Sequence, residues 1–382
     1  MIRWAVAATL LALASVQPVT AAGLSHTRQL AAAYDAILDA EFERVPALLT
    51  AVCGKGTAPP PVCQVMDVVS RWWQLQADPL DRQGDAEFER RVNAAIAATE
   101  TWAAAEPGSA EAWFYVGGSY SARVQWRVLR GQRMAAARDG KRIKDALERA
   151  LELNPMLQDA WFGIGLYHYY ADVAPAALKF LRFLLLLPGG DRAQGLQEML
   201  RARERGELLR GEADYQLHWL YLWYEQQPAR ALELLQGLDA RYPTNPLFLQ
   251  RIADVRHVYF SDHQGSADSW KALLDRATAA GAALPQLAAA RARVGLAAEE
   301  IELAAPARAI DLLSPVIRAR SAEPYGVLAL AFLTRGDAYA AIGDRENAIA
   351  SYTSAIENAP SDDPDRVRTR ARDALARMRS KR

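Results

Sequence analysis

The sequence has no excess of charge of either sign. Lysine plus arginine and aspartate plus glutamate each number 45, so the formal net charge is zero. No overall field draws the chain to phosphates, and nucleic acid is therefore not an expected partner. Apolar residues make up 51% of the chain and charged residues 24%. This composition is typical of a folded protein and excludes long disorder and a multispanning membrane protein.

Long hydrophobic runs are absent beyond the N-terminus. There, Arg3 precedes an apolar run at residues 4–16 and small residues at 19–22. This order predicts a cleaved secretory signal peptide, residues 1–22, and a buried N-terminal helix is the alternative. The run of about 13 residues is short for a membrane span, and no cysteine follows for a lipid anchor. We therefore expect a periplasmic or secreted protein with no transmembrane segment after cleavage.

Cysteine is scarce, because only Cys53 and Cys63 occur. The Gly- and Pro-rich segment between them, residues 54–62, is not expected to be helical. In an oxidising compartment the pair predicts a disulfide, which would stabilise the protein by roughly 2–3 kcal/mol. Two separate thiols are the alternative, and a metal site would need more ligands.

Strand signals are also nearly absent. Apolar residues recur at spacings of three and four, interrupted by Pro, Gly and Asx every 15 to 25 residues or so. This pattern predicts helices joined by turns along the whole chain. In the N-terminal part we expect helices at 24–43, then one with Pro46 in its first turn, then 65–76, and 87–105 capped by Asp85.

The segment from Ala329 to Pro360 matches the 34-residue tetratricopeptide pattern. The matching residues are Phe332, Gly336, Tyr339, Gly343, Ala348, Tyr352, Ala355 and Pro360. Small residues let two antiparallel helices approach, and Gly343 allows the chain to turn. Arg335 departs from the pattern, because a large apolar residue is usual there.

Weaker copies of the pattern precede this unit. One opens at Trp113 and closes at Pro155 with about fourteen extra residues, and a second runs from Trp161, through Ala177 and Leu181, to near Pro188. A third has Ala231, Leu235, Leu238 and Pro243 in its second helix, with Trp219 in place of a small residue. Between 246 and 322 the pattern is degenerate, and its best remnants are Ala309, Leu313 and Val316.

The sequence thus predicts an all-α fold, with antiparallel helix pairs stacked as a tetratricopeptide-like superhelical solenoid. We expect a signal peptide at 1–22, an N-terminal helical region at 23–108, the solenoid at 109–360 and a basic capping helix at 361–382. Asp363 is expected to cap that last helix, with Pro364 in its first turn. Contact with an anionic lipid or partner surface is the alternative role of this Arg-rich helix.

A longer motif occupies the middle of the chain. Phe162-Gly163-Ile164-Gly165-Leu166-Tyr167 is followed by Pro175, Leu178-Lys179-Phe180-Leu181, Gly189-Gly190-Asp191-Arg192 and Gly195-Leu196. This part resembles the tetratricopeptide family that includes the yeast mitochondrial outer-membrane inclusion-clearance proteins, and similar exported bacterial proteins. The resemblance implies a helical-repeat protein associated with lipid or protein assemblies, without catalytic activity. The signal peptide and the cysteine loop depart from the eukaryotic members. A structural corner, with Asp191 capping a helix, is the alternative reading of the motif.

Motifs that carry chemistry are not found. Residues 117–121 lack the last glycine of a nucleophile elbow and lie in an expected helix, and residues 54–57 have phosphate-loop residues in the wrong order. His257 and His263, with Asp262, come nearest to a ligand cluster, but their spacing would place them on different faces of one helix. His168 and His218 fall at interior positions. We therefore expect no enzyme, no cofactor and no metal.

Candidate binding residues follow from the repeat register, because the first helix of each unit lines the concave groove. The residues left over from packing are Asp159, Phe162, Leu166, Tyr169, Tyr170, Gln216, Leu220, Trp223 and Tyr224. Rigid aromatic rings are favoured anchors for bound segments. Packing against neighbouring helices, including an inserted helix near 128–138, is the alternative.

These residues predict a scaffold that grips an extended peptide or a helix of a partner protein in its groove. Asp172 and Glu225 lie just beyond the aromatic residues, where they could pair with a cationic ligand or be solvated. A carrier of a lipid or an apolar small molecule, with a pocket at residues 167–187, is the alternative function.

Overall fold

The computed structural model describes residues 23–54, 58–173 and 189–380, so the expected signal peptide lies outside the described residues. Within these ranges the chain forms 17 α-helices and no β-strand, which confirms the predicted all-α fold. The helices are α1 (Thr27–Leu38), α2 (Val45–Cys53), α3 (Pro60–Ala77), α4 (Asp85–Ala105), α5 (Ala110–Leu129), α6 (Arg133–Leu153), α7 (Ala160–Val173), α9 (Arg192–Arg205), α10 (Arg210–Trp223), α11 (Pro228–Arg241), α12 (Pro246–Phe260), α13 (His263–Ala277), α14 (Pro285–Glu302), α15 (Pro306–Ala319), α16 (Val327–Ala341), α17 (Arg345–Asn358) and α18 (Val367–Ser380).

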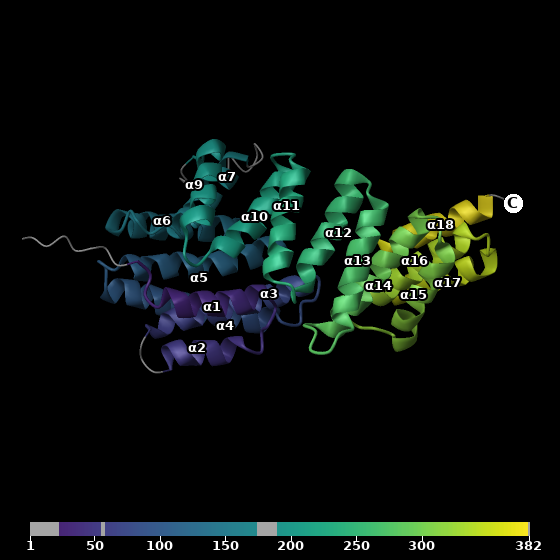
Figure 1. Ribbon diagram of the computed structural model, residues 1–382, viewed down its shortest axis with the longest axis horizontal. Helices are drawn as coiled ribbons and strands as arrows, with labels where there is room; N and C mark the ends of the chain where they lie inside the picture. Colours follow the sequence, from purple (N-terminus) through teal and green to yellow (C-terminus); the bar gives the residue numbers. More distant parts are fainter. Residues whose placement is uncertain (1–22, 55–57, 174–188, 381–382) are drawn as a thin grey trace, which may run out of the picture.

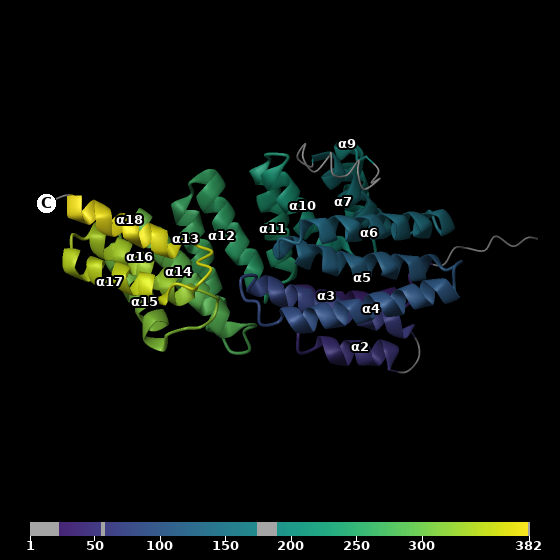
Figure 2. The same cartoon turned by 180° about the vertical axis from the view of Figure 1, so that it is seen from behind.

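Helices that are neighbours in the sequence pack against one another (Figure 1). Helices α1 to α6 lie side by side at one end, and the helices from α11 to α18 follow along the long axis of the molecule. The most extensive contacts are those of α5 with α6, α7 with α9, and α16 with α17. Seen from behind in Figure 2, α1 to α6 occupy one end and α14 to α18 the other. This stack of helix pairs is the predicted solenoid.

The α16–α17 pair has the packing that its repeat pattern predicts. A side chain at Gly336 would come within 2.6 Å of the Tyr352 ring, so glycine is needed for the helices to approach. Gly343 takes a φ of 83° in the turn, a conformation that glycine adopts without strain. Arg335, the departure from the pattern, is accommodated because its guanidinium lies 5.0 Å from the centre of the Phe332 ring.

The extra residues of the unit between Trp113 and Pro155 lengthen its two helices. α5 has 20 residues and α6 has 21, compared with 15 and 14 in α16 and α17. The turn between them occupies residues 130–132. The expectation of an inserted helix near 128–138 is therefore wrong.

Several predicted helix ends move in the structure. α1 stops at Leu38, short of the expected residue 43, and Ala40 follows with a positive φ of 57°. Pro46 lies in the first turn of α2, as predicted. α3 already begins at Pro60, because proline suits the first helical position. The last residues of the cysteine loop are therefore helical, against expectation.

Two predicted caps turn out differently. Gly84 is the N-cap of α4, and Asp85 is its first residue. The Asp85 carboxylate instead accepts a hydrogen bond from Trp126 Nε1 at 3.0 Å and pairs with Arg130 at 2.7 Å. Asp363 accepts from the backbone N–H groups at the start of α18, as expected, but Pro364 lies in the turn before that helix.

The predicted disulfide is present. Cys53 and Cys63 are bonded, with an S–S distance of 2.01 Å, and no other cysteine exists in the chain. The bond joins the last residue of α2 to α3.

The N-terminal helices α1 and α3 pack against α10, far along the chain. Buried Glu212 on α10 accepts hydrogen bonds from the Tyr34 hydroxyl and from Trp73 Nε1, both at 3.2 Å. The Trp73 and Tyr215 ring centres are 4.8 Å apart. The chain's own N-terminal region therefore covers much of this helix.

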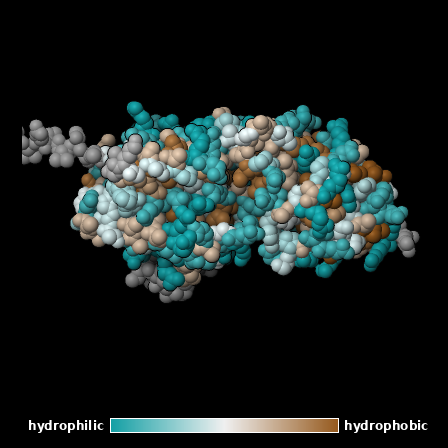
Figure 3. Space-filling model, turned by 90° about the horizontal axis from the view of Figure 1, so that it is seen from below, coloured by the Kyte–Doolittle hydropathy of each residue, from teal (hydrophilic) through white to brown (hydrophobic). Residues whose placement is uncertain are grey.

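One large apolar core extends from α1 into α14 and crosses the expected boundary at residue 108. Two smaller cores hold the C-terminal helices, and the remnant repeat residues Ala309, Leu313 and Val316 are buried in one of them. Viewed from below, the surface alternates hydrophilic areas with apolar patches over the middle and the C-terminal part (Figure 3). In the part of the chain that the structure describes, no helix is both long and apolar enough to cross a membrane.

Candidate functional site

Three of the predicted binding residues lie in the interior. Asp159, Phe162 and Tyr169 are all buried. The Asp159 carboxylate accepts hydrogen bonds from the backbone N–H groups of residues 207–209, at 2.8 to 3.0 Å. It thereby fixes the turn that leads into α10. The structure does not place these three side chains on an accessible surface.

The predicted residues of α10 divide into covered and accessible ones. Leu220 is fully buried, and the Gln216 side chain donates to Gln125 on α5 and to Glu212, both at 3.0 Å. The end of α10 remains open. There, 58% of the Trp223 surface is exposed.

The accessible aromatic residues form two ring pairs, Tyr170 with Tyr224 and Trp219 with Trp223, which we together call the aromatic edge. The Tyr170 and Tyr224 rings meet edge to face, with centres 5.8 Å apart, and both contact buried Tyr169 in the same way. Trp219 and Trp223 lie one helical turn apart with ring centres at 4.3 Å. Tyr170 is 36% exposed. The sequence-adjacent aromatic pairs of α7 and α10 thus come together, as their equivalent repeat positions suggested.

A charged pair, Arg192 with Glu225, lies beside Tyr169 and Tyr224. Arg192 Nε donates to Glu225 at 2.8 Å, and Arg192 Nη2 donates to the Tyr224 carbonyl at 2.9 Å. The Tyr169 hydroxyl donates to the same Glu225 carboxylate at 2.5 Å. The Arg192 hydrogen bond lowers the pKa of the Glu225 carboxyl, whereas burial and Glu225 raise the pKa of the Tyr169 hydroxyl. These hydrogen bonds therefore connect α7 and the end of α10 to α9.

Asp172 and Glu225 were candidates for pairing with a cationic ligand. Asp172 accepts a hydrogen bond from the backbone N–H of Arg192 at 3.1 Å, and Glu225 binds the guanidinium of the same residue. Both carboxylates therefore serve the internal joint between α7, α9 and α10.

The motif at residues 189–196 builds this joint. Asp191 caps α9 by accepting from the backbone N–H of Gln194, as predicted. A side chain at Gly165 would lie 2.6 Å from the Gly195 carbonyl oxygen, so two glycines let α7 and α9 cross closely. The close partner of α7 is therefore α9. Ala177 and Leu181, expected in that place, lie outside the described residues.

The interior histidines have structural partners. His168 Nδ1 is bonded to Glu198 at 2.7 Å. His218 is fully buried, its Nδ1 bonds to the Tyr215 carbonyl, and burial lowers its pKa to about 3. His218 therefore stays neutral at physiological pH, as a core side chain does.

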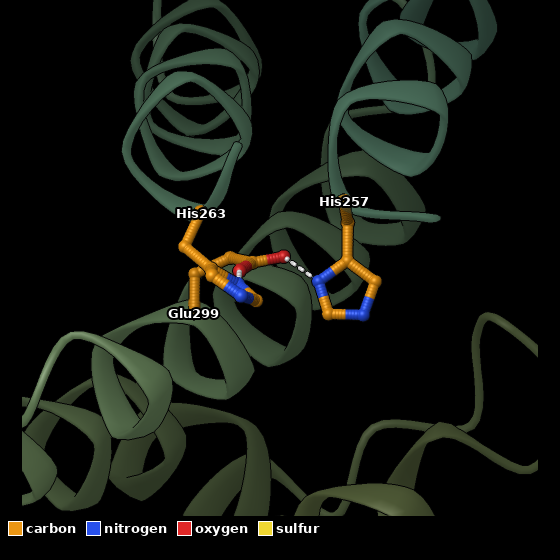
Figure 4. Close-up of side chains that lie close together, drawn as sticks. All are labelled: His257, His263 and Glu299. Atoms are coloured by element: carbon orange, nitrogen blue, oxygen red, sulfur yellow. Dashed lines mark hydrogen bonds and ion pairs between the residues drawn. The ribbon is translucent and has the colours of Figure 1, made fainter. Parts of the chain in front are cut away.

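His257 and His263 lie together, although we expected them on different faces of one helix. The helix ends at Phe260 and a new one begins at His263, with Ser261 between them in the left-handed conformation at φ 51°. The two rings therefore meet across a turn, with centres 5.2 Å apart, and both bond to Glu299 on α14 (Figure 4). The helical spacing argument failed because it assumed a continuous helix.

The serine of the near-elbow motif is structural. Ser119 is buried within α5, and its hydroxyl donates to the Val116 carbonyl at 2.8 Å and contacts the Thr99 hydroxyl at 3.2 Å. It lies in a regular helix and lacks the strained turn that exposes a nucleophilic serine.

An open groove of about 490 Å³ lies beside the disulfide, between α2, α3 and α4. Its lining residues are Leu49, Thr50, Cys53, Gly54, Cys63, Gln64, Asp67, Val68, Arg91, Ala94 and Ala95. Arg91 and Asp67 form an ion pair at 2.8 Å among them. Sequence reasoning missed this groove and expected a pocket at residues 167–187, most of which lie outside the described residues. The predicted disulfide could have indicated this groove, because it holds α2 against α3 and both cysteines line the groove.

The sequence matches no protein-family model and no curated protein. Among solved structures, the chain is similar to one in the crystal structure of the anaphase-promoting complex hetero-tetramer Cut9–Hcn1. Their TM-score is 0.51 at 15% identity, covering 93% of this chain and 57% of that one. The human IFIT1 dimer with PPP-AAAA gives a TM-score of 0.44 at 14% identity, covering 89% of this chain and 71% of that one. Yeast Tom70 gives 0.42 at 13%, covering 93% and 82%.

The chain spans little more than half the length of the Cut9–Hcn1 chain that it matches. At 15% identity the similarity concerns the fold alone. The fold is a tetratricopeptide-like helical solenoid, and the resemblance to the inclusion-clearance family is supported at that level only.

Proposed function

We propose that this protein is exported and is a scaffold that binds a segment of a partner protein at its aromatic edge. The observation that carries the proposal is Trp223, which exposes 58% of its surface while packing on Trp219. Aromatic rings that are already ordered bury a large area on binding at a small cost in entropy. Tryptophan is enriched among the few residues that contribute most of the binding energy in protein interfaces.

The chemistry of the edge indicates an apolar or aromatic segment as the occupant. Arg192 and Glu225, the charged pair beside Tyr224, already bind each other. The partner is therefore recognised by packing, and we expect its affinity to change little with ionic strength, since ion pairs are the contacts that salt screens. The structurally similar Cut9 is itself seen in a complex with Hcn1.

Export rests on the sequence of residues 1–22, which has the order of a signal peptide. The Cys53–Cys63 disulfide supports it, because disulfides persist in oxidising compartments.

The test is a cross-linking capture from the envelope and medium of the source cell, followed by an affinity measurement with the captured protein. We compare the wild type with a Tyr170→Ala, Trp223→Ala variant. The matched control is Tyr259→Ala, Phe260→Ala, which removes two aromatic rings of 40% and 44% exposure at the end of α12. We expect the edge variant to weaken binding by about 2 kcal/mol or more, as loss of central interface aromatics does.

The control variant should bind as the wild type does, and the affinity should persist in 0.5 M salt or thereabouts, where charge contacts are screened. Equal capture by all three proteins would refute the assignment of the aromatic edge. Capture that salt abolishes would refute recognition by packing.

The groove beside the disulfide favours a second candidate, a carrier of an apolar small molecule. Its volume of about 490 Å³ falls in the range of ligand pockets, and Leu49 and Val68 contribute apolar surface to it. Ala94→Trp would fill the groove, whereas Ala97→Trp on the same exposed side of α4 does not line it. A carrier should co-purify with extractable lipid that Ala94→Trp alone removes, and a scaffold should come out empty in every form.

A further inference from the structure

Three side chains from three helices, none of them part of the aromatic edge, converge at the α12–α13 turn (Figure 4). His257 lies in the last turn of α12, His263 is the first residue of α13, and Glu299 lies near the end of α14. Each histidine Nδ1 is 2.9 Å from a different oxygen of the Glu299 carboxylate. All three candidate ligand atoms lie within 4.8 Å of one another.

The carboxylate is buried, and the two imidazoles are partly exposed. Glu299 is buried, and its Oε1 also accepts a hydrogen bond from the Ser266 hydroxyl at 2.8 Å. The His257 and His263 side chains are 43% and 32% exposed. Across the described ranges, the ion-pair partners of Glu299 are these two imidazoles, with no lysine or arginine among them. A buried carboxylate in such surroundings is suited to a cation.

We propose that His257, His263 and Glu299 bind a divalent transition-metal ion, and that zinc is the ion they fit. Two imidazole nitrogens and one carboxylate oxygen are ligands that zinc takes at bond lengths of about 2.0–2.2 Å. Tetrahedral bonds of that length place ligand atoms about 3.3 Å apart. One histidine nitrogen already lies 2.9 Å from the shared oxygen and must move away by about 0.4 Å. The other histidine now bonds to the second carboxylate oxygen, so its partly exposed ring must turn toward the shared one.

Binding requires each Nδ1 to give up its hydrogen. In the metal-free arrangement each ring donates a hydrogen bond from Nδ1 to Glu299, since the carboxylate can only accept. When Nδ1 binds the ion, that proton leaves Nδ1 and the ring keeps one proton on Nε2. No electron is exchanged. Ser266 keeps its hydrogen bond to the carboxylate and orients it, as partners of metal ligands commonly do.

The ligand set decides which ions compete. Calcium and magnesium prefer oxygen ligands only, so two imidazoles select against them. Three protein ligands leave a fourth position of a tetrahedral ion for water or for a group from another molecule. The bound ion would join the α12–α13 turn to α14, whereas the aromatic edge is built from residues of α7 and α10 and from Tyr224, which follows α10. The metal site and the proposed partner site can therefore fail independently of each other.

The test uses the full exported chain, stripped of metal with a chelator and carrying no histidine tag. Zinc chloride is titrated by calorimetry, and cobalt(II) chloride is titrated while the visible absorption is recorded. The variants are His257→Asn, His263→Asn and the double substitution. His168→Asn is the matched control, because it removes another histidine bonded to a carboxylate, Glu198 at 2.7 Å.

We expect one zinc ion per wild-type chain and an intense tetrahedral cobalt spectrum. Mutation of a residue that hydrogen-bonds to a metal ligand commonly weakens metal affinity by about 10-fold or more. Loss of a ligand itself, in either single variant, should weaken zinc binding by at least this factor. The double variant should lose the site, and His168→Asn should keep it. As a check that needs no variant, zinc should shift the ring signals of two of the five histidines in the wild-type NMR spectrum. Absence of saturable zinc binding, or equal affinity in the double variant, would overturn the proposal.

Discussion

The close crossing of α7 and α9 makes a sharp prediction for Gly165. A Cβ atom there would lie 2.6 Å from the Gly195 carbonyl oxygen and 2.9 Å from the Met199 backbone nitrogen. Replacing an exposed helical glycine by alanine stabilises a helix by about 0.8–1 kcal/mol, but overpacking costs about 1–3 kcal/mol. Because backbone atoms cannot rotate away from the new Cβ atom, we take the upper end of the overpacking cost, about 3 kcal/mol. Gly165→Ala should then destabilise the protein by about 2 kcal/mol.

Gly237 provides the matched control, because it is exposed in α11 and a Cβ atom there would meet nothing within 4 Å. Gly237→Ala should stabilise the protein by about 0.8–1 kcal/mol, the gain in helix propensity alone. Urea unfolding followed by far-UV circular dichroism measures both changes, with tryptophan fluorescence as a second probe. If Gly165→Ala unfolds at the same urea concentration as Gly237→Ala, the α7–α9 crossing is not as close as described.

Two further predictions concern the charged joint and the disulfide. The pKa of Glu225 is lowered by Arg192, so this contribution to stability is present above the carboxyl's ordinary pKa of 4.5 and is lost as pH falls through the lowered value. Urea midpoints should fall more steeply with acid in the wild type than in Arg192→Gln, and parallel curves would contradict this. Replacing Cys53 and Cys63 by serine should cost roughly 2–3 kcal/mol and speed hydrogen exchange in α2 while sparing α14 to α18. A uniform increase in hydrogen exchange along the chain would contradict the view that the disulfide stabilises α2 locally.

The fold could be predicted from the sequence because its signals are local. Gly336 and Tyr352, sixteen residues apart, meet in one helix pair, and their repeat positions specify that contact. The same reasoning brought Tyr170 and Tyr224 to equivalent places, and the structure has their rings 5.8 Å apart. Spacing within a repeat thus carries the packing between adjacent helices.

Contacts that join distant segments carried no such signal. The repeat register predicted that Gln216 and Leu220 would be accessible in the groove. In the structure Leu220 is buried, and α1, α3 and α5 contact Glu212 and Gln216 on the same helix. The meeting of His257 with Glu299 depends on where one helix stops. Ser261 adopts a left-handed conformation there. A glycine at this position would have predicted the end of the helix, whereas a serine does not.

The contacts of α1 with α10 and the segment after α11 also bear on how the chain folds. Tyr34 and Glu212 are separated by 178 residues in the sequence, and Asn245 donates to the Leu38 carbonyl across 207. A chain synthesised from its N-terminus cannot complete the packing of its first helices until about two thirds of it has appeared. Simple solenoids nucleate anywhere and propagate between neighbours, but contacts of such long range slow folding and couple distant parts. A nascent chain that stops before α10 would leave Tyr34 and Trp73 without Glu212 and Tyr215, and such exposed side chains promote aggregation.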